Sequence, residues 1–180
     1  ADYSDGGQLD ITVIFYRIAP NAKPLLQLIR ERRCDAVVLF PVDKIVDQIP
    51  HLIEAEIPTM LINGKIAANR IGYVNNESYA GAIQAMEYLA ECGHRKIGFL
   101  CNALEASENH QQRLQAYLDV MARINPDYNK GWIIPHQPTN ETTQAGYNQC
   151  GQLLEMFPEV TAIFCTNDEM AIGAIKACWD

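Results

Sequence analysis

The sequence predicts an α/β fold in which helices cover parallel β-sheets. Short apolar runs rich in β-branched residues alternate with helical patterns along most of the 180 residues, and this alternation is the signature of βαβ units. The apolar runs are unbroken, as in strands that are covered on both faces. Apolar residues form 48% of the chain and charged residues 20%, which is the balance of a globular protein rather than a disordered one.

The expected elements follow from these patterns in chain order. The expected strands are residues 9–16, 36–40, 59–62, 71–74, 96–101, 132–134 and 160–165. The expected helices are residues 21–33, 43–55, 77–91, 107–124 and 142–157, with a last helix that Thr166 caps and that runs through Met170 and Ile175 to the end of the chain. Pro50 suits the first turn of a helix, so the second helix proper is expected to begin near Gln48. Gly93 supplies a left-handed residue that ends the third helix.

Two incomplete lobes are expected from this pattern. The alternation is interrupted between Lys65 and Val74, which places one lobe at residues 8–66 and the other at residues 67–180. The first lobe has fewer strands and helices than a complete α/β lobe. The final helix has no glycine, proline or following strand to end it, so the domain is expected to be truncated at both ends. Residues 1–8 are polar and glycine-rich, as in an unstructured lead-in.

Charge and cysteine usage argue against several classes of function. The chain has 14 basic and 22 acidic residues, a net charge of −8 and a pI near 4.9. Such a surface repels phosphate groups, so this segment is expected to bind neither nucleic acid nor an anionic membrane. No apolar run approaches the roughly 20 residues that span a bilayer, and no signal-peptide pattern opens the chain. The six cysteines include no C-x-x-C pair and suit free thiols in a reducing cytoplasm.

The stretch Val160–Ala174 predicts a strand, a tight polar turn and a helix. Thr166 and Glu169 have the spacing of a capping box, in which each side chain bonds the backbone N–H of the other. The turn is expected at the carboxyl edge of a parallel sheet, where ligands bind, and the amide of Asn167 offers donors and an acceptor to a ligand hydroxyl. On this stretch alone the simpler interpretation is favoured, in which Thr166, Asn167 and Asp168 only cap the helix.

Four stretches of the chain carry more specific motifs. Gly93–Leu100 reads G-H-R-K-I-G-F-L, and Thr161–Ala174 reads T-A-I-F-C-T-N-D-E-M-A-I-G-A. Ile57–Asn63 is a strand that ends in a polar residue, and Arg113–Tyr117 reads R-L-Q-A-Y. Gly93–Leu100 resembles the G-H-R-x-I-x-F-L signature of one family, and Thr161–Ala174 resembles its T-A-I-F-x-x-N-D-x-M-A-x-G-A segment. Ile57–Asn63 resembles the strand of that family that ends in a ligand contact, and Arg113–Tyr117 resembles its R-x-x-G-[FYW] segment. That family is the lactose repressor (LacI/GalR) family of transcription regulators, and the resemblance covers most of the chain beyond Gln8.

The resemblance implies a periplasmic-binding-protein-like fold, in which two Rossmann-like lobes with parallel sheets close on a small effector, usually a sugar. The effector contacts that it implies are Asn63, Arg113, Asn167, Asp168, Asn109 and Asn76. It also implies a homodimer that contacts DNA only through an N-terminal helix-turn-helix. Residues 1–180 contain neither that helix-turn-helix nor the late V-G-F-D-D segment of the family. Ala116 replaces the usual glycine, and Asn63 stands where many members carry Asp, so it binds hydroxyls with less charge assistance.

The remaining polar residues show no pattern typical of catalysis, of a metal site or of a bound cofactor. The guanidinium of Arg113 has five donors that suit the neighbouring oxygens of a sugar, and its structural alternative is an exposed arginine or a pair with Glu108 or Asp119. None of the four histidines has metal spacing, and no P-loop, G-x-G-x-x-G or G-x-S-x-G motif is present. The main hypothesis is therefore the effector-sensing domain of a cytoplasmic repressor. The alternatives are a solute-binding protein of a sugar uptake system and a sugar-processing enzyme of flavodoxin-like topology.

Overall fold

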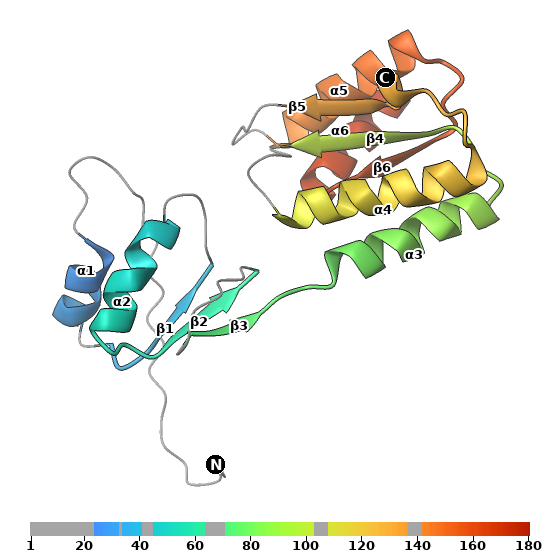
Figure 1. The fold of residues 1–180 in the computed structure, drawn as a ribbon. Helices are drawn as coiled ribbons and strands as arrows, with labels where there is room; N and C mark the ends of the chain where they lie inside the picture. The colour runs from blue at the N-terminus through green and yellow to red at the C-terminus, as the bar shows by residue number, and fades with distance from the viewer. Residues whose placement is uncertain (1–23, 33, 41–44, 64–70, 103–107, 137–141) are drawn as a thin grey trace, which may run out of the picture. The chain divides into compact units, whose positions relative to one another are not determined.

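The chain forms two compact α/β units, Ala1–Asn75 and Asn76–Asp180, each with a parallel sheet and helices (Figure 1). The computed structural model describes residues 24–32, 34–40, 45–63, 71–102, 108–136 and 142–180. The lead-in expected at residues 1–8 and the strand expected at residues 9–16 lie outside these ranges. Both sheets are parallel, as the alternation of strands and helices predicts.

The first unit is a parallel sheet in the order β1-β2-β3. Its elements are α1 (Leu25–Arg32), β1 (Val37–Leu39), the 3-10 helix η1 (Ile45–Gln48), α2 (Ile49–Glu54), β2 (Thr59–Ile62) and β3 (Ile71–Val74). Leu25 and Ile29 of α1 and Leu52 of α2 are buried together with Leu39 and Leu61 of the sheet. Pro50 lies in the first turn of α2, whose N-cap is Gln48, as expected.

The boundary between the units differs from the one expected at residue 66. β3 pairs with β2 along its whole length, from Thr59 opposite Ile71 to Ile62 opposite Val74. This short strand therefore belongs to the first sheet, and the units divide after Asn75. The sequence predicts the strand correctly, but the partner of a strand decides to which unit it belongs.

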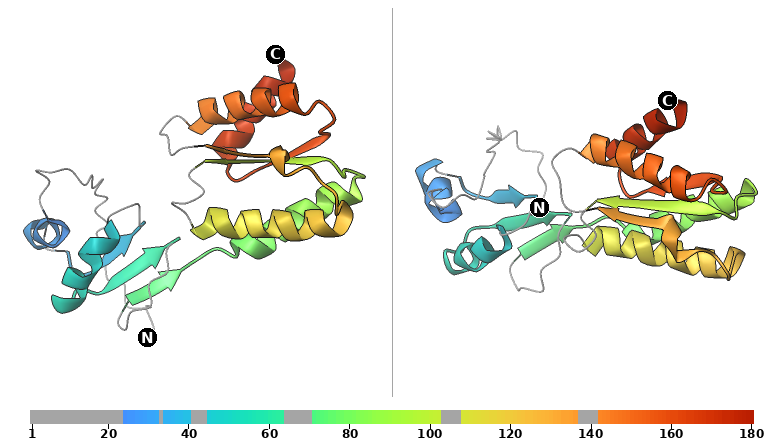
Figure 2. Two further views of the ribbon diagram at one scale, coloured as in Figure 1. Left: turned by 45° about the horizontal axis from the view of Figure 1, so that its top comes forward. Right: turned by 90° about the horizontal axis from the view of Figure 1, so that it is seen from above.

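The second unit has three layers, with a parallel sheet in the order β5-β4-β6 between two pairs of helices. Its elements are α3 (Ser78–Glu91), β4 (Ile97–Asn102), α4 (Glu108–Ile124), the 3-10 helix η3 (Lys130–Trp132), β5 (Ile133–His136), α5 (Thr142–Met156), β6 (Ala162–Cys165) and α6 (Asp168–Trp179). The helices α3 and α4 pack together on one face of the sheet, and α5 and α6 pack together on the other (Figure 2).

The central strand β4 carries the core of the second unit. All six of its residues are buried, which fits the expectation of a strand covered on both faces. The ring of Phe99 packs against Tyr117 of α4 and Phe164 of β6, with centroids 5.1 Å and 5.9 Å away. The hydroxyl of Tyr117 donates a 2.8 Å hydrogen bond to the carbonyl of Ile97. By contrast, the residues of β6 are only partly buried, so the expectation of a strand covered on both faces is not met there. Among the described strands, β6 lies at one side of this sheet and pairs with β4 alone.

The helices α5 and α6 touch through their backbones. A Cβ atom added to Gly173 of α6 would lie 2.0 Å from the carbonyl oxygen of Thr143, and one added to Gly146 of α5 would lie 2.3 Å from that of Met170. Both distances are far below van der Waals contact, and the atoms in the way belong to backbone. The two glycines therefore set how closely the helices approach each other.

Replacing Gly173 with alanine is expected to destabilise the second unit. The added methyl group has to push two helix backbones apart, and overpacking of this kind costs about 1–3 kcal/mol or more. Gly151 of α5 is the matched control, because a Cβ there meets nothing within 4 Å. Gly151→Ala should raise the free energy of unfolding by about 0.5–1 kcal/mol, since alanine favours a helix over glycine. Urea unfolding of both variants measures this difference, and equal stabilities would contradict the backbone contact.

Candidate functional site

Asn167 is the N-cap of α6 and follows directly after β6. Its backbone is extended, with φ −153° and ψ 168°, and its side-chain oxygen accepts a 2.9 Å hydrogen bond from the backbone N–H of Met170. The predicted capping box of Thr166 and Glu169 is therefore wrong by one residue. The N–H of Thr166 still donates to the carbonyl of Leu100 in β4, so Thr166 continues the strand and cannot cap the helix. The cap uses only Oδ1 of Asn167, which leaves its Nδ2 group as the part available to a ligand.

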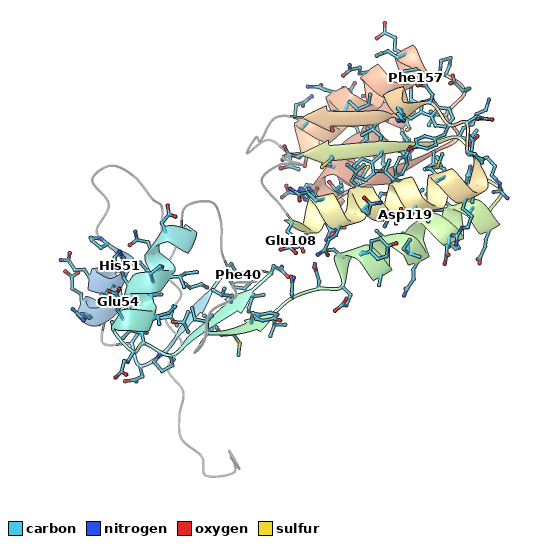
Figure 3. The ribbon with its side chains drawn as sticks, viewed as in Figure 1. Phe40, His51, Glu54, Glu108, Asp119 and Phe157 are labelled. Atoms are coloured by element: carbon cyan, nitrogen blue, oxygen red, sulfur yellow. The ribbon has the colours of Figure 1, made fainter. Side chains whose placement is uncertain are left out.

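Arg113 reaches from α4 to the end of β6. Its Nη1 donates a hydrogen bond to the backbone carbonyl of Thr166. The predicted alternative partners are bonded elsewhere, since Glu108 accepts from Gln112 and Asp119 accepts from Gln115 and Tyr79. Figure 3 shows Glu108 and Asp119 on α4. Arg113 therefore fixes the loop that leads into α6, and its remaining N–H groups are donors at the same edge of the sheet.

Cys101 and Thr166 lie beside Arg113 at the carboxyl ends of β4 and β6. Burial raises the pKa of the Cys101 thiol, and the hydrogen bond with Thr166 and the charge of Arg113 partly oppose this rise. The thiol therefore stays neutral near pH 7. Sequence reasoning missed Cys101 as a neighbour of the site, although its position near the carboxyl end of a strand is a signal that could have identified it.

A cavity of about 680 Å³ opens at this edge of the second unit. Its polar lining is Asn76, Glu77, Ser78, Arg113, Thr166, Asn167 and Asp168. Its apolar lining includes Ala82 and Leu89 of α3 with Ile163 and Phe164 of β6. The N-terminus of α3 lies near the carboxyl ends of the strands (Figure 1), so the polar groups gather at one end of the cavity and the apolar wall continues along α3 and β6.

The structure brings together four of the predicted site residues. Asn76, Arg113, Asn167 and Asp168 all line the cavity. Asn109 lies half-buried in the first turn of α4, but it is not among the lining residues. Asn63 belongs to the first unit, where it follows β2 with a left-handed backbone (φ 59°).

Asn63 is held by the first sheet at the carboxyl end of β2. Its N–H donates a 2.9 Å hydrogen bond to the carbonyl of Val74 in β3, and the residue is exposed. Asparagine tolerates the left-handed conformation better than most residues, which explains its place at this turn. Its role as an effector contact stays a prediction.

Ser78 is a second residue that sequence reasoning missed. It is 5% exposed, and its hydroxyl donates a 2.8 Å hydrogen bond to the side-chain oxygen of Asn76. Asn76 is thereby oriented at the start of α3, on the side of the cavity where Asn167 and Asp168 begin α6. Asp168 lies in the first turn of α6, where a carboxylate is stabilised by the helix dipole.

Other polar residues of the motifs have structural partners. Nδ1 of His94 lies 3.0 Å from the hydroxyl of Thr161, and Arg95 donates to the carbonyl of Ala90 at the end of α3. Among the described residues, no group of three or more His, Cys, Asp or Glu side chains is placed to hold a metal ion. None of the described helices combines the length and the apolar character needed to cross a bilayer.

Comparison with known proteins adds to this geometry. Residues 24–180 match the profile of the family described as "Periplasmic binding protein domain". The HTH-type transcriptional regulator AscG of Escherichia coli (strain K12) is 29% identical over 160 residues, which cover 88% of this chain and 46% of that protein.

Two solved structures have the same fold. A regulatory protein of the LacI family from Chloroflexus aggregans is 31% identical, with a TM-score of 0.71, and the match covers 86% of this chain and 54% of that one. A sugar-binding transcriptional regulator of the LacI family from Escherichia coli, crystallised with phosphate, is 30% identical with a TM-score of 0.69 and the same coverage of 86% and 54%.

The chain belongs to the periplasmic binding protein domain family, in the form that LacI-family transcription regulators carry. The predicted fold class is therefore confirmed. The chain spans about half the length of the curated relatives that it matches, 46% of AscG and 43% of the repressor ExuR of Bacillus subtilis.

Two substitutions of Asn167 are expected to show how much its helix cap contributes to stability. Asn167→Ala removes the bond to the N–H of Met170 and should lower the free energy of unfolding by about 1 kcal/mol. Asn167→Asp keeps a capping oxygen and adds a charge that the helix dipole favours, so its stability should equal that of the unchanged protein or exceed it. Thermal unfolding of the two variants tests this assignment, and an Asn167→Ala variant of unchanged stability would refute it.

Proposed function

We propose that this chain is the effector-sensing part of a cytoplasmic, DNA-binding transcription regulator, and that the cavity of the second unit binds a small polar effector. The observation that carries the proposal is the convergence of Arg113, Asn167, Asp168 and Asn76 at one end of that cavity. Regulators of the LacI family among the relatives support it. These relatives favour a transcription regulator over a solute-binding protein of an uptake system and over an enzyme.

A sugar or sugar derivative suits the chemistry of the cavity. The free donors of Arg113 and the Nδ2 group of Asn167 can bond sugar hydroxyls, and the carboxylate of Asp168 can accept from them. Ile163 and Phe164 supply an apolar wall against which a ring can pack, which is the usual combination in small-molecule sites. One similar solved structure is described as a sugar-binding regulator.

DNA contact is proposed for a part of the protein outside these residues. The chain carries a net charge of −8, which disfavours contact with phosphate groups. An effector would act by binding one conformation of the protein more tightly than another and so shifting the population of the form that binds DNA. This mechanism requires no chemical turnover of the effector.

We also propose that the regulator is a homodimer, with the outer face of α6 in the interface. Ile172, Ile175 and Trp179 follow one another at i, i+3 and i+7, so they share one helix face. Within residues 1–180, Ile172, Ile175 and Trp179 are 60%, 57% and 87% exposed, and large apolar side chains aligned on one helix are typical of an interaction surface.

A second copy of α6 fits this face by symmetry. Two copies packed antiparallel about a two-fold axis place the apolar side chains of each helix against those of the other. Ile172 and Ile175 flank the middle of the helix and would meet at the axis.

Removing the guanidinium of Arg113 is expected to weaken effector binding. Loss of hydrogen bonds from a charged donor costs about 1.5–3 kcal/mol, a decrease in affinity of roughly 10- to 100-fold. A thermal-shift screen of sugars and sugar phosphates on the full-length protein identifies a ligand, and calorimetry then measures its affinity for Arg113→Ala.

Arg123→Ala is the matched control for this experiment. Arg123 is on the same helix, but it pairs with Glu87 at 2.8 Å and does not line the cavity. The affinity of the Arg123→Ala variant for the ligand should be unchanged. Melting temperatures without ligand show whether either variant is misfolded. An Arg113→Ala variant with full affinity would remove the proposed site.

Charged substitutions on the outer face of α6 are expected to produce monomers. Ile172→Asp combined with Ile175→Asp places four carboxylates at the proposed axis, where desolvation and repulsion oppose association. Light scattering after size-exclusion chromatography of the full-length protein measures the mass. Met156→Asp is the control, because Met156 is 55% exposed but lies on α5. If the double variant stays dimeric, another surface or another segment covers this face.

A further inference from the structure

Two cysteine thiols lie against each other between α5 and α6. The Sγ atoms of Cys150 and Cys178 are 3.7 Å apart. Cys150 is completely buried and Cys178 is exposed. Neither residue lines the cavity proposed for the effector, so the effector site gives no reason for this pair.

The geometry of the helices brings the two thiols within reach of a covalent bond. Cys150 is one turn after Gly146 and Cys178 is five residues after Gly173, the two positions where the helix backbones touch. Farther along the same interface, the hydroxyl of Tyr147 donates a 3.1 Å hydrogen bond to Asp180, and Nζ of Lys176 lies 5.4 Å from the centre of the Tyr147 ring. These contacts hold the last turn of α6 on α5.

Within a single copy of residues 1–180, small solutes can reach one thiol of the pair. Cys178 lines a second cavity, of about 420 Å³, together with Cys165 and Trp179. Cys150 is not among its lining residues. An oxidant that enters this cavity therefore meets Cys178 first and finds Cys150 directly behind it.

We propose that Cys150 and Cys178 are a modification site for a small peroxide, which joins them in a reversible disulfide between α5 and α6. In the first step the sulfur of Cys178 attacks one oxygen of hydrogen peroxide, the O–O bond breaks, and a sulfenic acid and water form. In the second step the sulfur of Cys150 attacks the sulfenic sulfur. The S–O bond then breaks, and the hydroxyl leaves as water with the proton of Cys150. Two thiols and one peroxide thus give one disulfide and two waters, and a dithiol reductant reverses the change.

The environments of the thiols support this order of reaction. Burial raises the pKa of Cys150 to about 12, with further contributions from Cys178 and Cys165. Burial likewise raises the pKa of Cys165 to about 12. Both thiols are protonated near neutral pH and are therefore poor nucleophiles toward peroxide. Cys178 is the member of the cluster that reacts first, and Cys150 is the member that completes the disulfide. Transient disulfides of this kind serve in redox sensing inside cells.

Peptide mapping of the oxidised full-length protein tests the site. The protein is treated with hydrogen peroxide, the remaining thiols are blocked with a maleimide, and the digest is analysed by mass spectrometry with and without dithiothreitol. The expected product is an intramolecular cross-link between the Cys150 and Cys178 peptides that reductant removes. The melting temperature of the oxidised protein should rise by several degrees and return on reduction, because the cross-link restricts the unfolded chain.

Single substitutions separate the pair from the other thiols. Cys178→Ser changes an exposed side chain and should abolish the cross-link without loss of folding, and Cys150→Ala should leave Cys178 as a sulfenic acid or a more oxidised form. Cys92→Ser and Cys165→Ser are the controls that should retain the cross-link. A disulfide between two chains, a Cys165–Cys178 cross-link, or overoxidation of Cys178 with Cys150 still free would each overturn the proposal.

Discussion

The buried strand β4 is the constraint on which the second unit depends. All six of its residues are buried, and β5 and β6 pair with it in parallel register on either side. Because the three strands run in the same direction, their carboxyl ends meet at one edge. The ladder extends to the N–H of Thr166, so the strand pairing itself decides where α6 can begin. The polar groups of the cavity lie at this edge because the backbone leaves the sheet there.

The fold was largely predictable from the sequence, since strong local signals mark most elements. The strands β2 and β3 have the predicted bounds, 59–62 and 71–74, and Gly93 is left-handed as expected (φ 92°). The predictions fail where a local hydrogen bond or a neighbouring element changes the structure that the sequence pattern indicates. Trp132 was expected in a strand but belongs to η3, because the side chain of Asn129 accepts a hydrogen bond from the N–H of Gly131 and begins that turn. On α5 the buried face includes Gly146, which lies against the backbone of α6, and Gln149, whose side chain donates to the carbonyls of Cys101 in β4 and Ile134 in β5.

The candidate site was predictable only where a motif marks it. Arg113 and Asn167 carry motif positions, and both line the cavity. Cys101 and Ser78 have no such mark, because their relation to the site depends on strand pairing and on the start of α3. The structure also changes the choice between structural and functional interpretations of Arg113 and Asn167. One donor of Arg113 and one acceptor of Asn167 are used within the fold, while the other groups of the same side chains face a cavity. A single residue can hold the loop in place and present a donor from it.

The contact between Gly146 and Gly173 has a mechanical consequence. Side chains between two helices act as a compliant layer, since changes of rotamer let the helices slide past each other by small amounts. No such layer exists where the backbones of α5 and α6 touch, so at this point a shift of one helix requires a shift of the other. A displacement imposed on the first turn of α6 would therefore be shared with α5.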